Sequence, residues 1–125
     1  MTREGAGRRP ARGLCLPHGR RKDPLDMSIT VNIYYAGRDG SARTFAEEMV
    51  SSGIVSRVRA EEGNERYEYF FPMYDPETVL LIDRWRDEEA VRIHHKSEMM
   101  VEIAALRDKY RLHMRIERFT DAVRS

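Results

Sequence analysis

The sequence is poor in three features that would each have indicated a class of protein. Its single cysteine, Cys15, excludes a disulfide within the chain and fits a reducing compartment, so we expect a cytoplasmic protein. No stretch approaches the roughly 20 apolar residues of a membrane span, and no apolar signal-peptide core is present, so we expect no membrane partner. A net charge of +1 favours no nucleic acid partner.

What is present is the material for one folded domain. The 125 residues are 41% hydrophobic, which is enough for a core, and 34% charged, which makes the surface strongly ionic. The near-zero net charge hides an asymmetry, because residues 1–26 carry seven basic side chains against three acidic ones. We therefore treat residues 1–26 separately from a domain at residues 27–125.

Residues 1–26 show no hydrophobic period, and they contain three prolines and four glycines. Their few apolar side chains cannot offset the entropy of ordering the segment, so we expect a disordered basic tail. Such a tail could instead bind nucleic acid or anionic lipid, and an organellar transit peptide is a third reading. A strand pattern begins directly after Met27, so the tail also fits an upstream extension from a misplaced start.

The remaining chain alternates between strand and helix patterns. Period-two stretches and β-branched or aromatic runs predict strands, and apolar residues spaced by three and four predict helices. The expected elements are strands at 28–36, 64–74, 78–86 and 111–120, and helices at 41–60, 88–95 and 98–110. The order is β-α-β-β-α-β, which predicts an α+β, ferredoxin-like fold with a four-stranded antiparallel sheet and helices on one face. Gly53, inside the apolar stripe of the first helix, indicates either close packing on the sheet or a kink.

The second face of this sheet has no cover within one chain. Its aromatic content is too high for a plain solvent face, so we expect a second copy of the chain to close over it. Tyr67 and Tyr69 share one face of their strand, and packing across such an interface is a commoner role for them than touching substrate.

An ordered set of short motifs resembles the antibiotic biosynthesis monooxygenase family, including its quinol monooxygenase-like members. The resemblance runs from about Ile29 to Phe119. It is carried by Ala60-Glu61-Glu62-Gly63-Asn64, Arg66-Tyr67-Glu68-Tyr69, Asp75-Pro76, Leu81 to Trp85, Asp87-Glu88-Glu89-Ala90, His94-His95 and Ser97. The resemblance implies a dimeric α/β barrel that oxidises a hydroquinone-like or phenolic ring with O2, using neither metal nor flavin.

Such chemistry needs aromatic side chains against the ring and neutral polar groups that help remove a phenolic proton. The resemblance makes His94, Asn32 and Trp85 the candidate catalytic residues. The candidate substrate-binding residues are Tyr67, Tyr69, Asn64, His113 and His95. Each has a purely structural alternative: Trp85 as a core or interface residue, His94 as a hydrogen-bonded structural histidine, and Asn32 as a partner of neighbouring backbone. The catalytic reading requires Trp85, Asn32 and one helix histidine to line a common cavity.

Helix geometry separates the two adjacent histidines, because successive side chains point about 100° apart. Ala90 and Val91 define the inward stripe, so His94 is the one expected to face a pocket. Asp83 shares a face with Trp85, and we expect it to pair with Arg115 in a structural role.

Metal binding is not expected, because no cysteine or carboxylate stands at ligand spacing from His94. Haem degradation, found in a branch of the same family, ranks below quinol oxidation because Ser97 to Lys109 contains no histidine to bind iron. A non-catalytic barrel that binds a small ligand, and an isomerase-like activity, remain as alternatives.

Overall fold

The computed structural model describes residues 27–121, so the tail expected at residues 1–26 lies outside the described part of the chain. Eight elements follow in order: β2 (Ile29–Ala36), α1 (Ser41–Ser51), α2 (Ile54–Arg59), β3 (Asn64–Phe70), β4 (Thr78–Trp85), α3 (Glu88–His95), α4 (Glu98–Lys109) and β5 (His113–Thr120). The predicted β-α-β-β-α-β order and ferredoxin-like α+β class are confirmed. No helix among these residues is long and apolar enough to cross a membrane.

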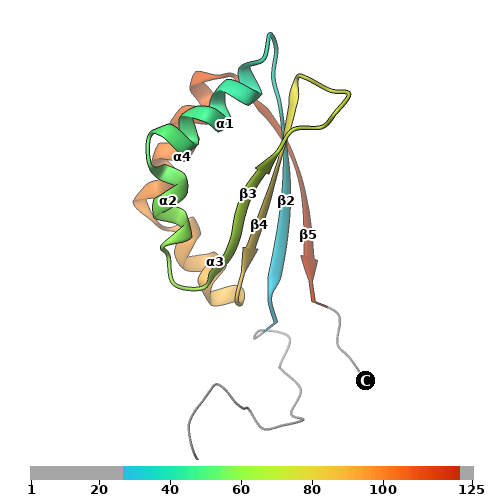
Figure 1. Ribbon diagram of the computed structural model, residues 1–125. Coiled ribbons are helices and arrows are strands. Elements are labelled where there is room, and N and C mark those ends of the chain that lie inside the picture. The colour runs from blue at the N-terminus through green and yellow to red at the C-terminus, as the bar shows by residue number, and fades with distance from the viewer. Residues whose placement is uncertain (1–26, 122–125) are drawn as a thin grey trace, which may run out of the picture.

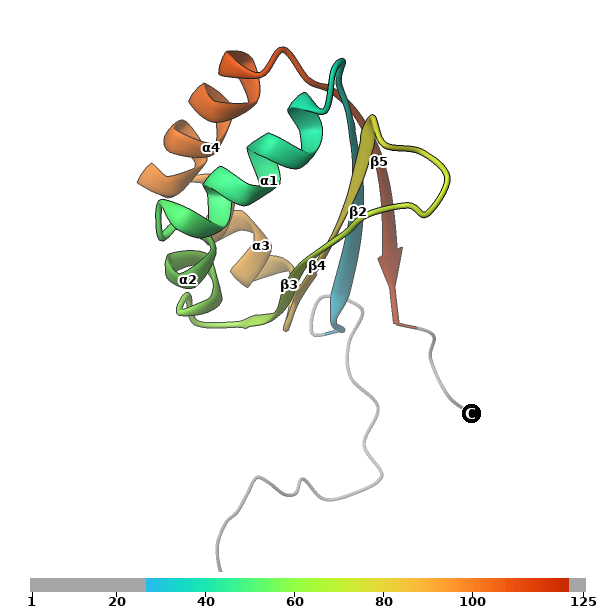
Figure 2. The same cartoon turned by 45° about the horizontal axis from the view of Figure 1, so that its top comes forward.

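The four strands form one antiparallel sheet in the order β3-β4-β2-β5. Strands β4 and β2 are therefore central, and β3 and β5 form the two edges. All four helices cover the same face of this sheet, and no element formed by residues 27–121 covers the opposite face (Figure 1). The turned view shows the same two-layer arrangement, with β5 at the edge away from α1 and α2 (Figure 2).

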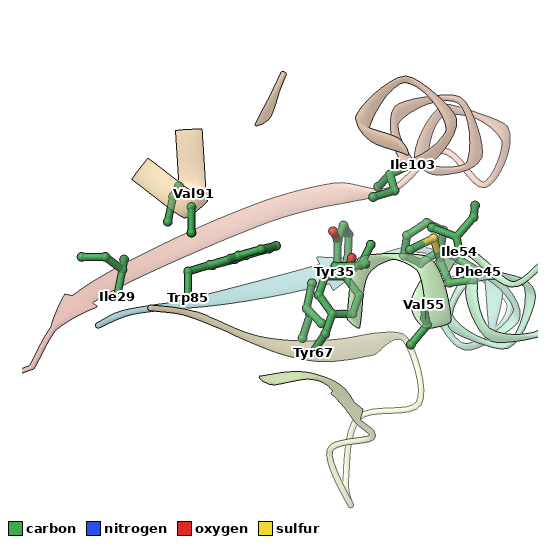
Figure 3. Packing of buried hydrophobic residues seen from close by; sticks show 13 residues of the cluster. Ile29, Tyr35, Phe45, Ile54, Val55, Tyr67, Trp85, Val91 and Ile103 are labelled. Atoms are coloured by element: carbon green, nitrogen blue, oxygen red, sulfur yellow. The ribbon is translucent and has the colours of Figure 1, made fainter. Parts of the chain in front are cut away.

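Strict alternation along β4 decides which side chains enter the core. Val79, Leu81, Asp83 and Trp85 are buried beneath the helices, and the residues between them are only partly buried. The alternation follows from the two-residue period of a strand. In β2 the same face carries Ile29 and Tyr35, which join Trp85 in the main hydrophobic cluster (Figure 3).

The helix predicted at residues 41–60 is interrupted. Gly53 adopts a left-handed φ of 88° and separates α1 from α2. A Cβ at this position would meet no atom within 4 Å, so close packing does not explain the glycine. The kink is the correct alternative, because glycine enters left-handed conformations without the steric cost that a Cβ imposes.

Two strands are shorter than the alternation predicts. Strand β3 ends at Phe70 rather than residue 74, since Pro72 cannot donate a hydrogen bond to a ladder. Strand β5 begins at His113, after Arg111 takes a left-handed φ of 54°. The start of α3 is as expected: the Asp87 carboxylate accepts a hydrogen bond from the Ala90 backbone N–H at 2.9 Å.

Candidate active site

A small cavity lies between the covered face of the sheet and helices α3 and α4. Its volume is about 110 Å³. The apolar half of its lining consists of Ile33, Leu81, Met100, Ile103, Met114 and Ile116. Six polar or titratable side chains also line it: Tyr35, Tyr67, Asp83, His94, His95 and Arg107. An apolar space with a few converging polar groups is the usual composition of a ligand site.

Asp83 is the buried carboxyl group of this cavity. It lies in the middle of central strand β4, between Val31 of β2 and Tyr67 of β3, and is 6% exposed. Its Oδ1 atom is buried and has no hydrogen-bond partner among the described residues. Burial raises the pKa of Asp83 to about 7, because the charged carboxylate is poorly solvated there. A hydrogen bond from Trp85 opposes the rise, and the charge of Glu61 adds to it.

Trp85, two residues after Asp83 on the same buried face of β4, forms a stacked pair with His94. Their ring centroids are 4.6 Å apart with an interplanar angle of 30°, and both side chains are buried. On its other side, His94 Nδ1 lies 2.9 Å from Oε2 of Glu61. The Trp85 indole extends along the sheet toward Tyr35 and Tyr67 (Figure 3). The four residues therefore form a continuous series, Glu61–His94–Trp85–Asp83, which we call the buried polar series.

Three tyrosines extend the polar lining away from Trp85. Tyr35, Tyr67 and Tyr69 are all on the covered face, and burial raises the pKa of each phenol above its usual value. They therefore remain neutral hydrogen-bonding groups near pH 7. The Tyr69 hydroxyl is buried and has no hydrogen-bond partner within residues 27–121, although Tyr69 lies next to the cavity lining rather than in it.

Some of the predicted site residues are brought together and others are not. His94, His95 and Tyr67 line the cavity, and Trp85 stands directly behind His94. As expected, His94 is the inward member of the histidine pair, being 3% exposed, whereas His95 is exposed and borders the cavity from one side. Burial, followed by the charges of His94 and Arg118, lowers the pKa of His95.

The expectation that Asn32 shares this cavity is wrong. Asn32 pairs with Ile82 and Glu117 on the open face of the sheet, opposite the face that carries Asp83 and Trp85. Its Oδ1 atom is buried there, and no described residue forms a hydrogen bond with it. The period-two assignment placed Asn32 correctly within its strand, but the site hypothesis required it to be on the other face.

Two further predicted binding residues lie elsewhere. The Asn64 side chain donates to the backbone oxygens of Arg66 and Arg84, at 3.2 and 3.4 Å, and so holds an irregular start of β3. His113 is exposed at the start of β5 and lines a separate surface cleft beside Gly37. Neither residue is among those that line the cavity.

Two expected packing arrangements are also corrected. Tyr67 and Tyr69 face the helices, so they are not on the face proposed for dimer contact. Asp83 does not pair with Arg115, which lies over the Tyr34 ring and bonds Glu117. The sequence signal for Asp83 was its place two residues before Trp85 in an apolar strand, and Glu61 had no signal beyond its motif.

Residues 27–121 contain no cluster of side chains suited to hold a metal ion. No group of three or more histidine, cysteine, aspartate or glutamate side chains is placed there to hold an ion. The cavity is also smaller than the roughly 300–1,000 Å³ of typical cofactor and drug-sized sites.

Comparisons with known proteins agree with the sequence resemblance. The chain is 34% identical over 69 residues to a Bacillus subtilis (strain 168) protein named "Putative monooxygenase YcnE", covering 55% of this chain and 70% of that one. Among solved structures, PA3566 from Pseudomonas aeruginosa superposes with a TM-score of 0.65 at 21% identity, covering 78% of this chain and 97% of that chain. SnoaB, a cofactor-independent oxygenase from Streptomyces nogalater, superposes with a TM-score of 0.61 at 13% identity, covering 77% and 94%.

At these identities the two structures establish a shared fold. The sequence itself goes further, because residues 28–106 match the profile of antibiotic biosynthesis monooxygenases. That match spans β2 to most of α4 and includes every member of the buried polar series. The chain therefore belongs to the antibiotic biosynthesis monooxygenase family.

Proposed function

We propose that the protein is a monooxygenase that oxidises a single phenolic or hydroquinone-like ring with O2 and needs no bound cofactor. The observation that carries the proposal is Asp83: a buried carboxyl group with a pKa of about 7 and a free Oδ1 atom in an aromatic-lined cavity. A base is most effective when its pKa is near the working pH. A burial-raised pKa of this kind is also a mark of functional sites.

Asp83 supplies the first step of the proposed reaction. Its carboxylate takes the phenolic proton, and the ring anion that forms is a far stronger electron donor than the neutral phenol. One electron passes to O2, and the resulting pair joins through a carbon–oxygen bond at a ring carbon. The proton held by Asp83 then goes to the outer oxygen of the peroxide.

The second step completes the balance of atoms and electrons. The ring carbon loses its hydrogen to the carboxylate as the O–O bond breaks, so one oxygen becomes a carbonyl and the other leaves as water. Phenol and O2 thus give quinone and water, and the substrate supplies all four electrons. The neutral tyrosines, Tyr35 and Tyr67, can donate hydrogen bonds to the ring oxygen while it carries charge.

The cavity size limits the substrate. A void of about 150 Å³ holds benzene, so about 110 Å³ fits one ring only if the walls adjust. Met100 and Met114 are the walls most able to do so, because an unbranched thioether repacks at low cost. Fused polycyclic substrates are not expected to enter.

Oxygen uptake tests the proposal directly. Purified, chelator-treated protein should consume O2 with hydroquinones or phenols faster than buffer does, and Asp83→Asn should slow uptake by about 10²–10⁴-fold. Asp108→Asn is the matched control, because Asp108 is an exposed carboxylate on α4 outside the cavity lining. Uptake at the buffer rate with every compound, combined with measurable ring binding, would instead support a ligand-binding role.

A further inference from the structure

Arg107 of α4 is a cation in the cavity wall without a carboxylate partner. Its side chain is half-buried, and its Nη1 atom donates a weak hydrogen bond to Met114 Sδ at 3.6 Å. Within residues 27–121, seven arginines form ion pairs with aspartate or glutamate and five form none, and of these five only Arg107 lines the cavity. Its five N–H donors therefore meet little that accepts from them.

Arg107 lines the cavity together with Asp83 and Tyr35. Burial raises the pKa of the Tyr35 phenol; the charge of Arg107 opposes this rise and the charge of Asp83 adds to it, so both charges act on the same interior volume. Asp83 is 6% exposed, while Arg107 is half-buried. The cavity lining thus combines a deeply buried carboxyl group with a guanidinium that is closer to solvent.

Another side chain of the cavity lining, His95, adds no acidic group beside Arg107. It borders the same space, and burial, followed by the charges of His94 and Arg118, lowers its pKa, which favours the neutral imidazole. Glu88, on the same helix as His95, is already paired with Arg118. A planar guanidinium with free donors matches the two oxygens of a carboxylate.

We propose that the substrate ring carries an anionic substituent, such as a carboxylate, which Arg107 binds while the phenolic hydroxyl faces Asp83. The inference rests on the proposed function, in that it places the same phenolic ring in the same cavity. It adds a substrate class, ring acids of the hydroxybenzoate kind, and a residue that selects it.

Binding without turnover tests the proposal. Isothermal titration calorimetry under argon should be run with 4-hydroxybenzoate and with 4-hydroxybenzamide, which has the same shape and no charge. The wild-type protein should bind the carboxylate at least tenfold more tightly, and added salt should narrow the preference. Arg107→Gln should abolish the preference and leave amide binding within about twofold, and Arg107→Lys should restore part of it.

Arg38→Gln is the matched control. Arg38 is an exposed arginine outside the cavity lining, so its loss removes the same charge without touching the site. Equal binding of acid and amide by the wild-type protein would overturn the inference, as would a preference that survives Arg107→Gln. A preference that disappears equally in Arg38→Gln would also overturn it, because only the net charge would then matter.

Failure of this inference and failure of the proposed function give different results. Oxygen uptake with neutral hydroquinone that depends on Asp83, combined with no preference for the acid, would refute the anion site alone. An Arg107-dependent preference for the acid, combined with uptake at the buffer rate for every ring, would refute the oxygenase proposal and leave the anion site established.

Discussion

His94 Nδ1 lies 2.9 Å from Oε2 of Glu61, and the two side chains are only 4% and 14% exposed. The contact joins the turn after α2 to α3 and holds the imidazole against the Trp85 indole. Trp85 in turn acts on Asp83, because hydrogen bonding from the indole opposes the burial-raised pKa of that carboxyl group. The carboxyl group of the cavity is therefore influenced by a residue that does not border it.

The Asp83 titration should make stability depend on pH in an unusual direction. Its folded pKa of about 7 is above the roughly 3.9 of an unfolded aspartate, so the folded state binds the proton more tightly. The stabilisation of the folded state that comes from this tighter proton binding is complete below about pH 4, and it is lost as the pH rises to about 7. At pH 8, Asp83→Asn should therefore have a free energy of unfolding about 2–4 kcal/mol higher than that of the wild-type protein, seen as a higher urea midpoint. The difference should shrink at pH 5. Equal midpoints at both pH values would contradict this.

The same titration should control activity with the opposite sign, because the base must be ionised. We expect kcat/KM to rise between about pH 6 and 8 with a midpoint near the Asp83 pKa of about 7. Stability and activity thus change in opposite directions over the same range. A flat pH profile across this range would rule out Asp83 as the base.

Glu61→Gln should lower the pKa of Asp83. Removing the negative charge of Glu61 favours ionisation of the second carboxyl group, so the rate midpoint should shift to lower pH. The carbon chemical shift of the Asp83 carboxyl group should titrate at the same lower value. Glu62→Gln is the control, because Glu62 is next in sequence but 88% exposed and paired with Arg86. An equal shift in both variants would show that the effect is not local.

Gly63→Ala should destabilise the junction between α2, β3 and α3. Gly63 has a φ of 90°, and an added Cβ would lie 2.6 Å from the Ala90 Cβ. Gly40→Ala is a matched comparison, since Gly40 has a similar φ of 77° and open space around it. The left-handed conformation alone costs about 1–2 kcal/mol for a residue with a Cβ, and the contact with Ala90 adds to that cost only at Gly63. Equal urea midpoints for the two variants would show that α3 shifts away from the added Cβ at no cost in stability.

The sequence predicted the order of elements because that order depends on local patterns. Period-two and helical spacings are short-range signals, and they located every strand and helix to within a few residues. The errors arose where backbone chemistry acts locally against the pattern. Gly53 broke a helix whose apolar stripe continues past it, and Pro72 ended a strand whose alternation continues past it.

The site was less predictable because it depends on how faces of different strands combine. Period two placed Asn32 with Thr30 and Tyr34, but nothing local shows that this face is turned away from Trp85. Asp83 was assigned a surface-type partner for the same reason, since its burial becomes visible only when α3 and α4 cover the strand. Trp85 and His94 were found because a tryptophan and an inward helix position are local features.

We propose that the open face of the sheet is a homodimer interface. This face carries partly exposed apolar side chains, among them Ile82 of central strand β4 and Phe119 of edge strand β5, and an uncovered apolar face favours association. Sedimentation velocity at micromolar concentration should give a dimer, and Ile82→Lys should shift it to a monomer. Val101→Lys should leave the dimer intact, because Val101 is 72% exposed on α4, on the helical side. A wild-type monomer at these concentrations would exclude the interface. Dissociation of the dimer by both variants would show that the effect of Ile82→Lys is not specific to the open face, and would contradict the proposal as well.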